Sequence, residues 1–89
     1  RMLAFPEVVA SQGFDESKLT DAKVSVSCEF YIDSEGAVAL PVITDSGAHE
    51  LNGHFAAAFS QANFERPIAD GKPAIAFLKK TYLISVTVK

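Results

Sequence analysis

The most regular pattern in the chain is an alternation of apolar and polar side chains over Ala22–Asp33. The apolar positions are Val24, Val26, Cys28, Phe30 and Ile32, and the positions between them are Lys23, Ser25, Ser27, Glu29 and Tyr31. A period of two predicts a β-strand with one face on a core and the other mostly in water. The following Asp33–Gly36 is a turn signal, because Gly36 accepts a positive φ at little cost.

A second extended run, Ala37–Ile43, places Val38, Leu40 and Val42 on one face. Pro41 lacks the N–H that a sheet ladder needs, so it predicts an edge strand or a bulge at this point. The two runs and the turn between them predict an antiparallel hairpin.

Helical spacing replaces this alternation over Glu50–Ala62. The apolar residues recur every three or four positions, at Leu51, Phe55, Ala58, Phe59 and Ala62. This spacing predicts a helix with one face on the core. Pro67 cannot continue a helix, and Asp70–Pro73 is a second turn signal.

The last run, Ala74–Val88, is long and rich in β-branched residues towards its end, which predicts a strand. One parity is the expected core face: Leu78, Tyr82, Ile84, Val86 and Val88. Lys80 interrupts that face, which is expected if the strand extends past the body of the domain.

The N-terminal segment, residues 1–21, carries the weakest pattern. Pro6–Gln12 is predicted as a short helix, with Pro6 at its first position and Gly13 ending it. Phe14–Asp21 is predicted as a loop or a further short turn of helix. With residues 22–89 as a ββαβ core, the 89 residues predict a single α+β domain. Its expected architecture is a three-stranded antiparallel sheet with the main helix and the short N-terminal helix on one face.

Composition narrows the functional classes. The chain is 48% hydrophobic, has a net charge of -3 and contains no run of basic residues. This distribution argues against binding to nucleic acid or to an anionic membrane. No stretch approaches the ~20 apolar residues that span a bilayer. Because the chain opens at Arg1, we interpret it as an excised domain or a mature fragment, with any membrane anchor or export signal upstream.

The candidate chemistry is sparse. Cys28 has no second cysteine to pair with, and its place on the apolar face of a strand predicts a small buried hydrophobic side chain. His49 and His54 lie five residues apart, which does not stack them on one face of a helix. The acidic residues of the turn signals are expected to cap backbone N–H groups. The sequence therefore predicts no catalytic residue, no cofactor and no metal site.

Taken in order, several local motifs resemble the C-terminal domain family of TonB energy transducers. The resemblance covers nearly the whole chain. Its motifs are the aromatic–proline pair Phe5-Pro6, the strand Val24–Ile32 with its Asp33–Gly36 turn, the second strand and serine-containing turn Pro41–Gly47, the alanine-rich helix Phe55–Ala62, the aromatic Phe64 with Pro67, the Asp70–Pro73 turn and the closing strand Tyr82–Val88. Each motif is common by itself, and their order and spacing carry the resemblance.

Three departures from the family pattern bear on the partner more than on the fold. Ala62 stands where the family usually has a tryptophan. Both Glu65 and Arg66 lie between the aromatic residue and its proline, where a single residue is usual. The segment between Pro6 and Val24 is also longer than in most relatives.

The resemblance implies a periplasmic domain carried by an inner-membrane anchor and a flexible spacer. Family members bind the N-terminal segment of an outer-membrane receptor by β-augmentation, in which an extended segment adds as a strand to a sheet edge. An inner-membrane motor complex, reached through the upstream region, then pulls on that connection. The corresponding edge in this chain is the last strand, at Lys80, Thr81, Tyr82, Leu83, Ile84, Ser85 and Val86.

Two alternatives stay open at this level. The last strand can simply complete the sheet, with its edge closed by a second copy of the domain, because natural edges are often protected. The same fold can also serve an envelope protein-interaction or dimerisation module that has no role in transport. A strand-exchanged homodimer fits either function, because the long last strand can pair with its twin.

Overall fold

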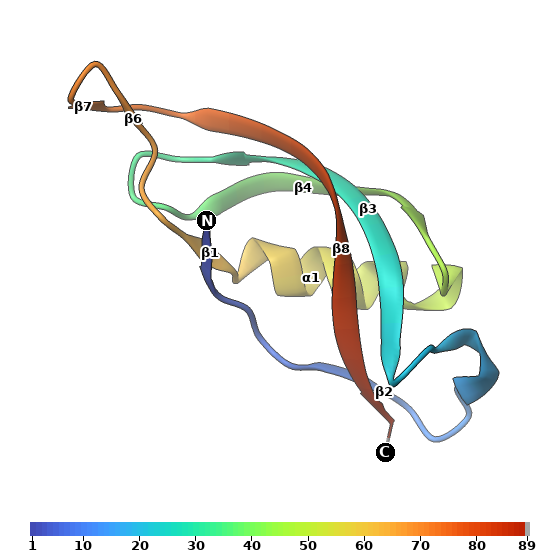
Figure 1. The fold of residues 1–89 in the computed structure, drawn as a ribbon. Helices are drawn as coiled ribbons and strands as arrows, with labels where there is room; N and C mark the ends of the chain where they lie inside the picture. The colour runs from blue at the N-terminus through green and yellow to red at the C-terminus, as the bar shows by residue number, and fades with distance from the viewer. Residues whose placement is uncertain (89) are drawn as a thin grey trace.

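Strand β3 (Lys23–Ile32) has a neighbouring strand on both sides. The computed structural model describes residues 1–88 of the 89-residue chain. Its main sheet has four strands in the order β2-β8-β3-β4, as Figure 1 shows. The bounds of the other three strands are Val8–Ala10 for β2, Val38–Ser46 for β4 and Ala76–Val88 for β8.

β3 and β8 form the longest ladder of the sheet. They pair antiparallel at ten consecutive positions without a bulge, from Lys23 opposite Ser85 to Ile32 opposite Ala76. The predicted alternation of β3 is confirmed, because its even-numbered residues are all buried. The inward parity of β8 is also the predicted one, and its members pack in or against the core: Leu78, Tyr82, Ile84, Val86 and Val88. Lys80 is the exposed exception on this parity.

β4 is the edge strand on the other side of β3, and it is irregular. Leu40 and Pro41 both lie opposite Phe30, between the pairs that Tyr31 and Glu29 make, which is a β-bulge. Leu40 has a left-handed φ of 54°. The prediction that Pro41 marks an edge strand or a bulge is confirmed on both counts.

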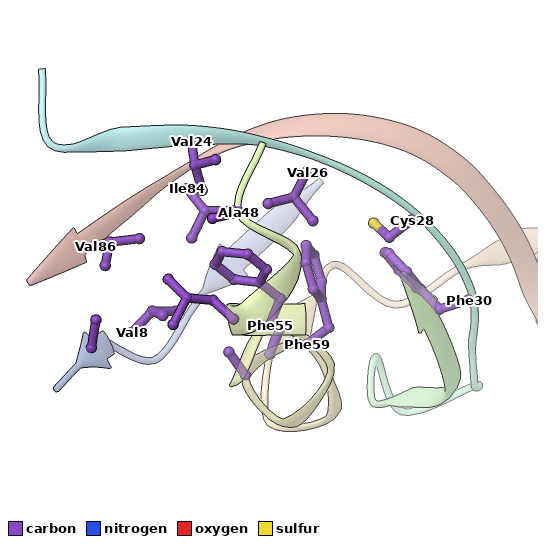
Figure 2. Close-up of a cluster of buried hydrophobic side chains, with 14 of the residues drawn as sticks. Val8, Val24, Val26, Cys28, Phe30, Ala48, Phe55, Phe59, Ile84 and Val86 are labelled. Carbon is purple, nitrogen blue, oxygen red and sulfur yellow. The ribbon is translucent and has the colours of Figure 1, made fainter. Parts of the chain in front are cut away.

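Helix α1 (Asn52–Ser60) covers one face of this sheet, which we call the inner face. It follows a single 3₁₀ turn, η2 (His49–Leu51). Phe55, Ala58 and Phe59 of the helix are buried, and Figure 2 shows both phenylalanine rings pointing towards β3. The predicted helix is therefore confirmed over α1, with its first turn replaced by η2.

Phe59 lies at the centre of the aromatic core. Its ring centroid is 4.9 Å from that of Phe5, 5.5 Å from that of Phe30 and 5.5 Å from that of Tyr82. These rings come from the N-terminal segment, β3 and β8, so one helix residue joins three parts of the chain. Aromatic pairs in such arrangements contribute about 0.5–1.5 kcal/mol each beyond the burial of their area.

The remaining elements are short. β1 (Met2–Ala4) pairs antiparallel with β5 (Asn63–Phe64), and β6 (Ile68–Ala69) pairs with β7 (Lys72–Pro73) around the predicted turn. A second 3₁₀ turn, η1 (Glu16–Lys18), lies in the segment predicted as a loop or short turn. Within residues 1–88, no helix is long and apolar enough to cross a membrane.

The prediction of a short N-terminal helix over Pro6–Gln12 is wrong. This segment contains β2, which runs parallel to the end of β8 and pairs Val8 with Val86 and Ala10 with Val88. A helix this short has little stability of its own, whereas β8 offers the segment both backbone partners and burial. The main sheet is therefore four-stranded and mixed, instead of three-stranded and antiparallel. The α+β class is confirmed.

The turn between β3 and β4 docks on β5. The Asp33 carboxylate organises it by accepting hydrogen bonds from the N–H groups of Glu35 and Ala37, both at 2.9 Å. Gly36 has a φ of 83°, and its carbonyl accepts a 2.9 Å bond from the Phe64 N–H. A Cβ atom at Gly36 would lie 2.2 Å from the Phe64 carbonyl oxygen. Because that oxygen is backbone, only a shift of the whole turn would make room.

We expect Gly36→Ala to lower the free energy of unfolding by about 2–4 kcal/mol. Gly71→Ala is the matched control, because Gly71 has a similar φ of 76° and open space at its Cβ position. The control should show only the backbone cost, about 1–2 kcal/mol. Urea denaturation of both variants measures the difference. Equal losses would show that the close approach to Phe64 does not contribute.

Candidate partner-binding edge

One side of β8 carries no partner strand over most of its length. β3 pairs with the other side from Ala76 to Ser85, and β2 reaches only Val86–Val88. No further strand of residues 1–88 pairs with β8. The segment Ala76–Ser85 is therefore a sheet edge, which we call the open edge (Figure 1).

Alternate residues of the open edge turn their backbone groups outward. The Val86 N–H donates a 2.8 Å hydrogen bond to the Ala22 carbonyl, on the β3 side. In an unbulged antiparallel ladder, the N–H and C=O of successive residues point to opposite sides, so every second residue before Val86 also faces β3. The residues between them face away from β3: Phe77, Lys79, Thr81, Leu83 and Ser85. An added strand would pair with their N–H and C=O groups, except the Ser85 C=O, which the parallel register of β2 assigns to Val8.

The structure divides the seven residues predicted for this edge into three groups. Three direct their backbone groups outward: Thr81, Leu83 and Ser85. Three have backbone groups that face β3 and side chains that lie on the parity of the inner face: Lys80, Tyr82 and Ile84. Val86 lies opposite Val8 of β2, so it belongs to the closed end of the strand.

Two residues of the open edge were missed by the sequence reasoning. Phe77 and Lys79 have the same outward parity as Thr81, and they lie before the first residue that was predicted. The signal was present, because the alternation of the last run extends back to Phe77. The resemblance pointed only to the end of the strand, where β2 in fact closes it.

A groove runs beside the C-terminal half of the open edge. It has a volume of about 350 Å³ and is lined by Met2, Phe5, Pro6 and Glu7 on the N-terminal segment and by Tyr82–Ser85 and Thr87 on β8. The Phe5 ring is held edge-to-face by Phe59, with their centroids 4.9 Å apart. An added strand would therefore find fixed apolar surface at this end of the edge.

The opposite edge of the sheet is poorly suited to strand addition. The β4 ladder is interrupted by two bulges. Pro41 has no N–H to offer, and the neighbouring Leu40 has left-handed backbone. Bulges and prolines are features by which natural edges avoid pairing. Of the two long edges of the sheet, the one on β8 is the regular one.

Residues 1–88 contain two ion pairs, and the side chains of both are exposed. Lys18 and Glu50 lie 2.6 Å apart, and the hydrogen bond between them lowers the pKa of Glu50. His49 lies 3.2 Å from Asp45. In the described part of the chain, no three His, Cys, Asp or Glu side chains gather as a metal site requires. Each ion pair contains a single carboxylate, so neither provides two carboxylates for acid–base chemistry.

Cys28 is a core residue. Its side chain is 1% exposed, and burial raises the pKa of its thiol to about 11. Only a thiolate acts as a nucleophile or a metal ligand, and a raised pKa disfavours the thiolate. The prediction that Cys28 is a small buried hydrophobic residue is confirmed.

Comparisons with known proteins do not place the chain in a family. No protein-family model, no curated protein and no solved structure matches the chain.

We expect amide hydrogen exchange to alternate along the open edge. The Thr81 and Leu83 amides should exchange at least about tenfold faster than those of Tyr82 and Ile84, because only the latter pair donates to β3. NMR spectra of the ¹⁵N-labelled monomer transferred into D₂O measure all four amides. Equal protection of the four would show that another part of the chain covers this edge.

We expect Cys28 to react slowly with iodoacetamide in the folded protein. At pH 8, a thiol with a pKa of about 11 is only about 0.1% thiolate. Mass spectrometry should show labelling that accelerates by at least about 100-fold in denaturing urea. In native buffer, the rate should rise as the pH approaches 11. Rapid labelling of the native protein at pH 8 would contradict the burial of this thiol.

Proposed function

We propose that this chain is the protein-binding domain of a TonB-like energy transducer, which captures an extended receptor segment as a strand added to the open edge. The observation that carries the proposal is the regular, unpaired side of β8 over Ala76–Ser85. The succession of β3, β4, α1 and β8 along the chain supports it, because this is the order of the ββαβ core that the resemblance implies. In this proposal, β2 is an addition to that core.

Backbone hydrogen bonds supply most of the affinity. The outward residues of the open edge offer five N–H groups and four C=O groups, because the parallel register of β2 assigns the Ser85 carbonyl to Val8. A net contribution of about 0.5–1.5 kcal/mol for each bond allows a short segment to bind after the entropy of ordering it is subtracted. The sequence of the segment matters less for these bonds than its ability to stay extended, which suits a domain that serves more than one receptor.

The closed end of β8 limits where the segment lies. β2 occupies the same side of β8 from Val86 onwards, so the added strand ends beside Ser85. There it meets the groove that Met2, Phe5 and Pro6 line. The N-terminal segment therefore acts as a stop that positions the bound strand along the edge.

The geometry also suits the transmission of force. Hydrogen bonds between strands lie across the strand direction, so a pull along the added strand loads all of them together. In the proposed setting, the domain is in the periplasm and is anchored in the inner membrane through its upstream region. The motor complex pulls from that side, and the N-terminal segment of the outer-membrane receptor is held at β8.

The second candidate function is an envelope protein-interaction or dimerisation module without a transport role. The same open edge favours it, because two copies of β8 can pair with each other in an antiparallel homodimer. The two functions differ in the occupant of the edge: a receptor segment in the first, and a second copy or another envelope protein in the second.

We expect peptides from the N-terminal extensions of the same organism's outer-membrane receptors to shift the amide NMR signals of Phe77, Lys79, Thr81, Leu83 and Ser85. Leu83→Pro should weaken binding by about 10-fold or more, because it removes an outward N–H and leaves the bonds to β3 in place. Leu83→Ala is the control at the same position, since it keeps the N–H and removes most of the side chain. Its affinity should stay within about 3-fold of the parent value.

The outcome that would overturn the transducer function is an absence of response to every receptor peptide. If the outward amides are then protected in a dimer, which light scattering or sedimentation would detect, the dimerisation module is the function of this edge. Both proline and alanine variants must keep the dispersed spectrum of the parent for either result to count.

A further inference from the structure

Two adjacent lysines interrupt the open edge near its middle. Lys79 and Lys80 are both exposed, and because successive residues of a strand point to opposite faces, their side chains lie on opposite sides of the sheet. Lys80 occupies the inward parity, between Leu78 and Tyr82, where the pattern calls for an apolar residue. An extended segment added here would have one ammonium group on each of its faces.

Neither of these two lysines makes a salt bridge within the described residues. Glu29 is the register partner of Lys79 on β3, but the two salt bridges in residues 1–88 are Lys18 with Glu50 and His49 with Asp45. The register partner of Lys80 is Cys28, which is a neutral thiol. Neither ammonium group is held in a salt bridge, and Lys80 has no acidic register partner, so both ammonium groups can contact a carboxylate of a partner.

The C-terminal half of the open edge, after the two lysines, is mainly apolar. The groove beside Tyr82–Ser85 is lined by the apolar residues Met2 and Phe5 and also by Glu7. A carboxylate on the partner would be repelled by Glu7 here, whereas an apolar or hydroxyl side chain would be accepted. The edge is thus cationic in one half and apolar with a negative charge in the other.

Building on the proposed function, we propose that the open edge selects an acidic extended segment of another protein. The segment carries two consecutive carboxylates opposite Lys79 and Lys80, and uncharged, largely apolar residues opposite Tyr82–Ser85. Two consecutive residues are required because neighbours in a strand point to opposite faces, so that one carboxylate reaches each lysine. Opposite charges directly across a sheet stabilise the pair, and like charges destabilise it.

The same lysines act against a second copy of the chain in one register. An antiparallel twin that aligns Phe77 with Leu83, the two large apolar residues of the outward parity, also places Lys80 directly opposite Lys80 of the other copy. This like-charge contact disfavours the pairing that would bury the most apolar surface. Specific interfaces use such repulsion as well as attraction to discriminate between partners.

The test uses synthetic peptides of about ten residues. One half contains alternating valine and threonine, and the other half contains two adjacent glutamates. Both sequence orders are made, so that a strand of either direction can bring the glutamates to the lysines. Matched peptides carry two glutamines or two lysines at the same positions, and dissociation constants come from NMR titration of the ¹⁵N-labelled chain.

We expect one order of the glutamate peptide to bind roughly 2- to 25-fold more tightly than its glutamine counterpart, and the lysine peptide to bind most weakly. The preference should shrink at high salt, because the lysines are exposed. The Lys79→Gln/Lys80→Gln variant should lose the preference and retain binding of the glutamine peptide. Lys72→Gln is the control, since Lys72 lies in β7, outside the open edge, and its removal should leave the preference intact.

Equal affinity of the glutamate and glutamine peptides would overturn the charge selection and leave strand addition in place. A double lysine variant that self-associates while its affinity for the glutamate peptide is unchanged would also overturn it, because the lysines would then serve only to protect the edge. If neither these peptides nor the receptor peptides shift any outward amide, strand addition itself fails, and the proposed function fails with it.

Discussion

The antiparallel ladder between β3 and β8 is the interaction on which the rest of the structure depends. It joins segments from distant parts of the chain, so its loop-closure entropy must be offset by what the pairing buries. Its ten pairs run without a bulge, which keeps the inward parities of both strands on one face, beneath α1. A slip of one residue would turn those apolar side chains into water. The burial of this face around Phe59 therefore holds the register of the whole sheet.

That ladder also determines what the far side of β8 presents. β3 occupies one side of β8, so the outward backbone groups from Phe77 to the Ser85 N–H remain on the other side. β2 covers the end of the strand beyond that point. The N-terminal segment then leaves β8 at Pro6, which has no N–H to continue the ladder, and Phe5 packs on Phe59. The result is an edge with one closed end and one apolar side. Bulges and a proline make the β4 edge the less receptive of the two.

In the proposed mode of binding, affinity and selectivity at this edge have separate sources. Backbone groups pair with any extended segment, and they therefore attract unwanted strands as readily as the intended one. Selectivity must come from side chains. Lys79 and Lys80 lie on opposite faces of the sheet, so an added strand would have a positive charge next to each of its faces. In the apolar half, the Leu83 side chain is 71% exposed. It offers apolar contact area to a partner but does not discriminate between acidic and basic residues. The inferred acidic partner follows from this division between the two halves of one strand.

The sequence by itself determined the elements whose period is strong: the alternation of β3, the core face of β8, the apolar face of α1 and the irregular edge at Pro41. Each follows from the need to bury one face of an element, which is visible in a short window. Only the tertiary structure decided that Val8–Ala10 is a strand, because a short apolar run suits a helix or a strand, and its partner lies at the other end of the chain. The candidate binding edge was likewise determined partly by the sequence and partly by the tertiary structure. The sequence located the edge on the last strand, but its limits depend on where β2 stops, and its outward residues depend on which side of β8 is occupied by β3.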